Sequence, residues 1–276
     1  MVQLVQILGL PFLACIIIGS ILGYLGIHVL KREVIFIDIA LAQIAAVGSI
    51  AAHLAFEVHG DSLGGYVCSL GCVFLAAGFY ALVRRRVVQI SLEAVIGISY
   101  AIAAAGALFL IGVAPGGHVH VQTMLSGSLL WARWPDVVTS LVFFSAVGLA
   151  FYIFREPFKR ISDDYDNAIA GGMRVVWWDF LFYALLGVVI TFAVRMAGVV
   201  AVFAFLIIPA TVSAQLRPKG AGRIVITWLA SIVASTGGLL FAYYLDFSLG
   251  PCVVVFLGVL LIIGSLASRY LQQRLT

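Results

Sequence analysis

Long apolar runs, each about the length that a helix needs to cross a lipid bilayer, dominate this sequence. Charged residues make up 10% of the chain and hydrophobic residues 63%, whereas soluble proteins average about 25% charged residues. We therefore predict an all-α, polytopic membrane helix bundle that forms one transmembrane domain over residues 1–276. The expected spans lie near residues 7–30, 34–56, 64–83, 91–113, 137–154, 176–194, 197–216, 224–245 and 250–268.

The exact number of crossings depends on residues 176–216. Two apolar runs there are separated only by Arg195-Met196-Ala197-Gly198. If both runs cross fully, the chain has about nine transmembrane helices, by the rule of roughly 20 apolar residues per helix. A re-entrant hairpin is the alternative, and it would leave about eight crossings by the same rule.

Basic residues fall in alternate loops between the expected spans, and the loops "EVHGD", "APGGHVHVQT" and "LDFSLG" contain no Lys or Arg. Cytoplasmic loops of membrane proteins are enriched in Lys and Arg. Nine spans would place every basic cluster in the cytoplasm, with the N-terminus outside and the C-terminus inside. The clusters are Lys31-Arg32, Arg84-Arg85-Arg86, Arg155 with Lys159-Arg160, Arg217 with Lys219 and Arg223, and Arg269 with Arg274.

One cytoplasmic loop carries an unusual polar segment, "KRISDDYDNAIAGGMRVV". Within it, "DYDNAIAGG" predicts a short helix, with Ser162 or Asp163 as the N-cap and Gly171-Gly172 at its end. Such a helix could dock into a cleft on a partner protein. A solvated loop that merely joins two spans is the alternative.

The polar segment resembles the acidic-x-acidic-x-Ala-x-Ala-x-Gly pattern of the cytoplasmic coupling segment in permeases of zinc/manganese/iron-type ABC importers. The matching residues are Asp164, Asp166, Ala168, Ala170 and Gly172. Four more stretches are similar to the same family, in the same order: "FIDIALAQIAAVG", "MLSGSLLWARWPDV", "RMAGVVAVFAFLIIPATVSAQL" and "STGGLLFAYYLDFSLGPCVVV". We call residues 159–175 the coupling segment.

The resemblance implies a transport subunit that is not itself an enzyme, in the bacterial cytoplasmic (inner) membrane. A separate cytoplasmic ABC ATPase would bind the coupling segment, an extracytoplasmic metal-binding protein would deliver the ion, and a second permease copy would complete a homodimer. The sequence fits this division of labour because it contains no G-x-x-x-x-G-K-[ST] phosphate loop. Zinc, manganese or iron would be the cargo; we expect no permanently bound cofactor and no nucleic-acid partner.

Ionisable residues inside spans are costly and therefore candidates for a transport pathway. Carboxylate and imidazole groups suit divalent transition metals. The metal-facing candidates within spans are Asp38, Gln43, His53 and Glu93. Asp38 and Glu93 lie near the cytoplasmic ends of their spans, so ion pairing with Lys31 or with Arg84–Arg86 is the structural alternative.

The second span departs from the family pattern, which commonly has an Asp and a His four residues apart. Ile39 and Gln43 occupy the matching positions here. "EAVIGISYAIA" and "PGGHVHVQ" resemble a branch that carries this Gln variant. The departure leaves open which metal is carried and whether the intramembrane site is intact.

His118 and His120 form the strongest metal-facing pair in the sequence, because alternate side chains of an extended loop point the same way. Two ligands would hold an ion loosely, which suits its transfer from a binding protein into a pore. A solvated polar loop without metal contacts is the alternative.

Pro209, inside "LIIPATVSAQL", is expected to kink the seventh span because proline removes a backbone hydrogen bond.

Three other functions are weaker alternatives. A gradient-driven secondary metal transporter or channel would be expected to show internal repeats and several central charges. A permease for a large metal chelate would be expected to be longer, with about one more span than the roughly 20-residue rule gives here. An intramembrane enzyme is the weakest alternative, because the sequence contains neither an HExxH nor a Gly-x-Ser-x-Gly motif.

Overall fold

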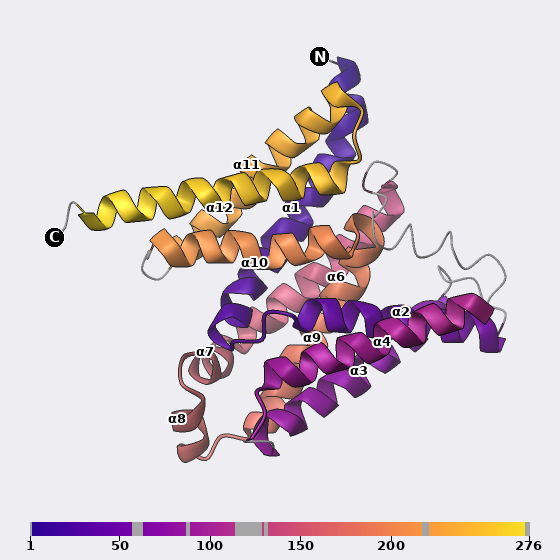
Figure 1. Ribbon diagram of the computed structural model, residues 1–276, viewed down its shortest axis with the longest axis vertical. Helices are drawn as coiled ribbons and strands as arrows, with labels where there is room; N and C mark the ends of the chain where they lie inside the picture. Colours follow the sequence, from indigo (N-terminus) through magenta and orange to yellow (C-terminus); the bar gives the residue numbers. More distant parts are fainter. Residues whose placement is uncertain are drawn as a thin grey trace. The chain divides into compact units, whose positions relative to one another are not determined.

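The structure is a computed structural model, and it describes residues 2–56, 63–86, 89–113, 129, 132–216 and 221–273. Among these residues, nine helices are long and apolar enough to cross a membrane. The predicted all-α, multi-pass membrane bundle is confirmed. Figure 1 shows the helices in chain order. The nine are α1 (Val2–Lys31), α2 (Ile37–Phe56), α3 (Leu63–Arg86), α4 (Leu92–Val113), α6 (Trp134–Ile153), α9 (Val175–Ala197), α10 (Val199–Leu216), α11 (Gly222–Leu245) and α12 (Leu249–Gln273).

Two short helices, α7 (Arg155–Asp163) and α8 (Tyr165–Ala170), lie between α6 and α9 in the chain. They cover most of the coupling segment. The single residue Gly198 separates α9 from α10, and its φ of 82° is a backbone conformation that suits glycine. Both flanking helices meet the length and composition for a full crossing.

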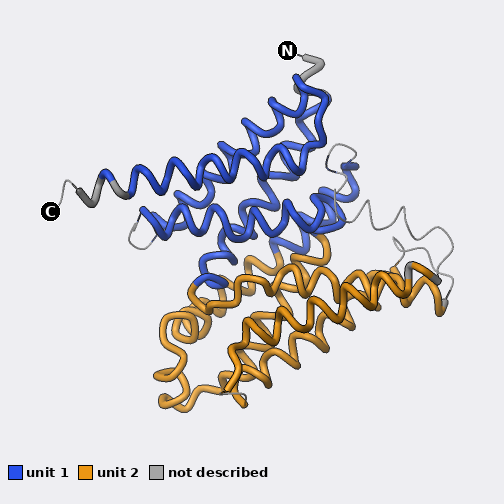
Figure 2. The backbone as a smooth tube through the Cα atoms, in the orientation of Figure 1, with its two compact units in different colours: residues 1–30, 123–145, 193–276 blue, residues 31–122, 146–192 orange. Residues whose placement is uncertain are grey.

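The described chain divides into two compact units (Figure 2). Unit 1 comprises residues 1–30, 123–145 and 193–276. Within it, α10, α11 and α12 pack against one another. A Cβ added at Gly26 of α1 would overlap the backbone carbonyl of Leu206 in α10, so these two helices approach at backbone distance.

Unit 2 comprises residues 31–122 and 146–192. In this unit α2 packs against both α3 and α4. A Cβ added at Gly48 of α2 would lie 2.9 Å from the carbonyl oxygen of Cys68 in α3. This close packing agrees with the abundance of small residues in the second span, because small side chains let helices approach closely in lipid.

Large apolar side chains are exposed on many spans, including Leu75, at 78% exposure, and Phe109, at 72%. Such surfaces suit lipid, since exposed apolar area of this extent is unfavourable in water. The core also contains buried polar groups, among them Arg32, Asp38 and Asp179. Pro209 is buried inside α10, and the kink expected there stays a prediction.

Candidate functional site

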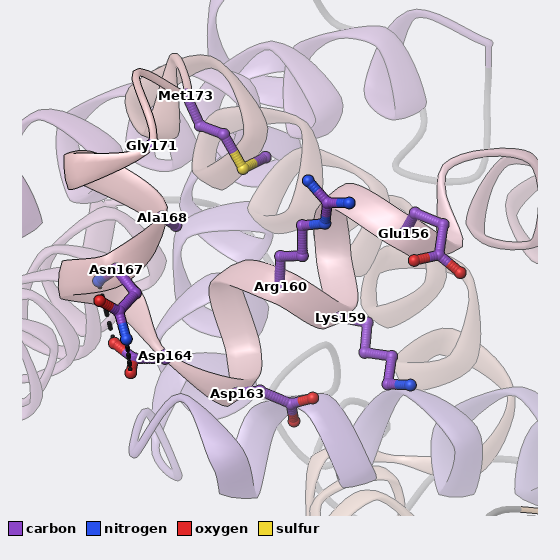
Figure 3. Close-up of a pocket in the computed structure, with 9 residues that line it drawn as sticks. All are labelled: Glu156, Lys159, Arg160, Asp163, Asp164, Asn167, Ala168, Gly171 and Met173. Atoms are coloured by element: carbon purple, nitrogen blue, oxygen red, sulfur yellow. Dashed lines mark hydrogen bonds between the residues drawn. The ribbon is translucent and has the colours of Figure 1, made fainter.

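The coupling segment is built from two helices separated by one extended residue, Asp164. At Asp164 the backbone angles are φ −156° and ψ 103°, which breaks the helix. Its side chain accepts a hydrogen bond from the backbone N–H of Asn167 at 3.0 Å and another from the Asn167 side-chain amide at 2.6 Å. Asp164 is therefore the N-cap of α8 (Figure 3).

The N-cap expected at Ser162 or Asp163 is wrong by one or two residues. Both residues lie in the last turn of α7. Buried Phe158 and Ile161 hold α7 against the protein, so the helix continues to Asp163 and first breaks at Asp164. The two side chains have other partners: Ser162 accepts a hydrogen bond from Arg32, and Asp163 pairs with Lys31.

The glycine pair ends α8, as the sequence predicts. The N–H of Gly172 donates to the carbonyl of Ile169 at 3.0 Å, and the N–H of Met173 donates to that of Ala168 at 3.2 Å. This pair of bonds is a Schellman motif, which needs a left-handed residue after the helix. Gly172 supplies it with φ 75°.

The residues of the coupling pattern occupy different positions on α8. Asp166 and Ala170 are exposed, as is Gly172 just beyond the helix. Ala168 is buried and packs with Ile161 of α7 and with the start of α9. Ala168 is therefore the motif residue that holds α8 against the rest of unit 2.

A cleft of about 380 Å³ lies between α7 and α8 (Figure 3). Its walls mix acidic, basic and small residues, so it suits a polar partner surface better than an apolar ligand. The lining residues are Glu156, Lys159, Arg160, Asp163, Asp164, Asn167, Ala168, Gly171 and Met173.

The structure brings together two of the predicted metal-facing residues, Asp38 of α2 and Glu93 of α4. They lie close enough to interact electrostatically. Asp38 is buried, and its Oδ1 has no hydrogen-bond partner among the described residues. Glu93 accepts a hydrogen bond from the backbone N–H of Phe36 at 3.0 Å through Oε1, while Oε2 has no such partner in the described chain.

Gln43 and His53, also on α2, are both half-buried. No group of three or more His, Cys, Asp or Glu side chains that could hold a metal occurs within the described residues. Two of the basic residues named as alternative partners for Asp38 and Glu93 bind other acids: Lys31 pairs with Asp163, and Arg84 with Asp179. His118 and His120 lie outside the described residues.

Asp179 of α9 is the important site residue that sequence reasoning missed. Its carboxylate is fully buried and binds Arg32 at 2.6 Å and Arg84 at 3.3 Å. The available signal was an acid inside the apolar run "VVWWDFLFYALLG", the same signal that selected Asp38.

Comparison with known proteins identifies the family. A model of the ABC 3 transport family matches residues 5–268. A probable metal transport system membrane protein of Chlamydia pneumoniae is 22% identical over 91% of this chain and 84% of its own length. A probable iron transport system membrane protein of Haemophilus influenzae is 23% identical over 91% of this chain and 86% of its own length.

A solved structure, PsaBC from Streptococcus pneumoniae in complex with Fab, has the same fold. It aligns with a TM-score of 0.80 and 22% identity, over 99% of this chain and 98% of the matched chain. The family match and the named metal and iron transport relatives confirm the resemblance to permeases of metal-type ABC importers. The chain belongs to the ABC 3 transport family.

Proposed function

We propose that this chain is the membrane permease of an ABC importer that carries a divalent transition metal into the cell, driven by a separate ATPase subunit. The family match over residues 5–268 is the observation that carries the proposal. The names of the relatives, which refer to metal and iron transport, support a metal ion as the cargo.

The coupling segment is proposed to be the contact with the ATPase. Its short helix is capped at both ends by its own residues, so its shape does not depend on a partner. Asp166 and Ala170 are exposed on it, and a polar cleft lies beside it. The contact residues proposed are Asp164, Asp166, Ala168, Ala170 and Gly172, with Ala168 acting through packing because it is buried.

Asp38 and Glu93 are proposed to contact the ion near the cytoplasmic end of its path. Each has a carboxylate oxygen without a hydrogen-bond partner in the described chain, and carboxylates are suitable ligands for zinc, manganese and ferrous iron. Gln43 and His53 are proposed as further contacts on α2, and His118 and His120 as the outer entry pair. Zinc is our leading candidate, with manganese or iron as alternatives.

The full assembly proposed is a homodimer of this permease with two further partners, an ATPase in the cytoplasm and a metal-loaded binding protein outside. We place it in the bacterial cytoplasmic (inner) membrane as one permease domain over residues 1–276, with the N-terminus outside. The distribution of Lys and Arg among the loops supports this orientation.

The test is metal-dependent ATP hydrolysis in proteoliposomes that contain this chain with its cognate ATPase and binding protein. Binding protein loaded with zinc, manganese or ferrous iron would be compared with the empty protein. Stimulation by one loaded form is the expected result, and it also identifies the cargo. Metal flux through the chain alone, without any complex with an ATPase, would instead support the gradient-driven transporter.

A further inference from the structure

We propose that Arg32, Arg84 and Asp179 form a buried charge cluster that locks the coupling segment to α3 and α9, so that these elements move as one body during transport. The inference rests on the proposed function and extends it from the ATPase contact to the connection behind that contact. All residues involved belong to unit 2.

Asp179 is the centre of the cluster. Its Oδ1 atom binds Nη1 of Arg32 at 2.6 Å and Nη1 of Arg84 at 3.3 Å. The Arg32 and Asp179 side chains are 0% exposed, and that of Arg84 is 13% exposed. Arg32 lies in the link between α1 and α2, Arg84 at the end of α3, and Asp179 in the second turn of α9. One carboxylate thus joins three separate segments.

Both arginines also contact the coupling segment directly. Arg32 donates through Nε to the Ser162 hydroxyl of α7 at 3.0 Å. The Arg84 guanidinium lies over the ring of Tyr165, the first residue of α8, with its carbon 4.2 Å from the ring centroid. Such cation–π contacts are strongest where water is excluded. Each short helix is therefore held by one arginine of the cluster.

Aromatic residues of α9 complete the surroundings. The Arg32 guanidinium carbon lies 3.9 Å from the centroid of the Phe182 ring, and Arg84 donates to the Tyr183 hydroxyl at 3.3 Å. Next to the cluster, Lys31 pairs with Asp163 at the end of α7. The adjacent residues Lys31 and Arg32 therefore bind the same end of α7.

A buried charge cluster contributes little to the free energy of folding, because removing its charges from water is costly. This cluster contains two cations and one anion, and breaking or leaving incomplete a buried ion pair is strongly unfavourable. Arg32 Nη2 and Asp179 Oδ2 are buried and have no hydrogen-bond partner among the described residues. An apolar cluster would hold the helices together without these costs. What the charges add is a fixed geometry, because the planar Arg32 guanidinium donates to Ser162 through Nε and to Asp179 through Nη1, which sets its orientation.

Tyr165 adds a hydroxyl group beside Asp179 of the cluster. Its hydroxyl and Asp179 are near enough to interact electrostatically, yet the hydroxyl makes no hydrogen bond of normal geometry with a described residue. Burial raises the pKa of Tyr165 to about 12, so the hydroxyl keeps its proton and can donate at physiological pH.

Distance measurement tests the rigid connection directly. Spin labels would replace exposed Ile169 on α8, which is outside the proposed contact residues, and exposed Trp177 on α9, in the full complex with native cysteines replaced. We expect one narrow distance distribution that is the same without nucleotide and with ATP trapped. A distance between the two labels that changes between these two nucleotide states would overturn the proposal.

Coupling is measured as metal taken up per ATP hydrolysed. Asp179→Asn keeps the shape of the side chain but removes its charge. We expect the ATPase still to bind and hydrolyse ATP, while uptake per ATP falls roughly two- to thirtyfold, the usual scale for changes in a coupling network. Tyr165→Phe leaves no buried charge unpaired, so it should fold normally. We expect it to broaden the distance distribution between the two spin labels.

Asp246→Asn is the matched control, since Asp246 is an exposed acid in unit 1 with a left-handed backbone that Asn tolerates. It should keep full uptake per ATP. A folded Asp179→Asn complex with unchanged uptake per ATP and an unchanged label distribution would refute the inference and leave the proposed function intact. Failure of the native complex to take up any metal would refute the proposed function instead.

Discussion

Glu93 offers a clean test at the scale of one residue, because its two carboxylate oxygens have different surroundings. Oε1 accepts the Phe36 backbone hydrogen bond, and Oε2 has no hydrogen-bond partner among described residues. Glu93→Gln keeps an oxygen for Phe36 but removes the charge. We expect metal uptake to fall roughly tenfold, the scale seen when a metal's surroundings are altered, with little change in thermal unfolding. Normal uptake rates would show that Glu93 serves only to accept the Phe36 backbone hydrogen bond.

Gly26 tests the packing of α1 against α10. An added Cβ would overlap the backbone carbonyl of Leu206, which cannot rotate away as a side chain can. We expect Gly26→Ala to destabilise the protein by about 1–3 kcal/mol, as overpacking usually does, and to lower the thermal unfolding midpoint in detergent. Gly9→Ala is the control on the same helix, because nothing lies within 4 Å of its Cβ position. Equal midpoints for both variants would contradict the close approach of these helices.

Single residues also show where sequence reasoning reaches its limit at the site. Asp38 and Glu93 both stand out in the sequence as polar residues in spans, but nothing in the sequence indicates that they lie near each other. Asp179 carries the same signal, an acid in an apolar span, but its partner Arg32 is 147 residues away, so nothing local indicates their ion pair. Residue chemistry can be read from the sequence, whereas the partner of a buried charge depends on tertiary packing.

At the scale of the element, α8 ends at a turn that requires the left-handed backbone conformation of Gly172. No atom lies within 4 Å of the Cβ position, so the requirement is backbone conformation and not space. We expect Gly172→Arg to abolish transport while the protein still inserts, because it strains the left-handed turn and adds charge beside the proposed ATPase contact. Gly172→Asn, which tolerates this conformation, should retain most uptake. Transport and ATPase co-purification would be measured for both, and normal transport by the Arg variant would count against the coupling role.

The spans could be predicted because about twenty apolar residues in a row leave little choice but a membrane helix. Helix α7 was not predicted, since nine residues with several charges give no such length signal. Its helical form is explained by the burial of Phe158 and Ile161 on one face. Because α7 extends to Asp163, α8 begins later than the sequence predicts, and its N-cap is Asp164 instead of Ser162 or Asp163.

At the scale of the whole molecule, the basic loops predict the orientation of the chain in the membrane. Nine crossings would put the termini on opposite sides, with the N-terminus outside. Alkaline phosphatase fused at the N-terminus should therefore be active outside the cytoplasm, and a fluorescent protein fused at the C-terminus should fluoresce inside. Both termini on one side would mean that one of the helices in 175–216 does not cross.

The ion pairs of Asp179 have a consequence for how the chain is made. Synthesis runs from the N-terminus, so Arg32 and Arg84 leave the ribosome before Asp179 exists. In the predicted orientation, both arginines would during that interval be free cations that hold their loops on the cytoplasmic side. When α9 arrives, the same two side chains become buried partners. In that orientation the arginines would act first as signals for the insertion machinery and later as ion-pair partners of Asp179 in the folded protein.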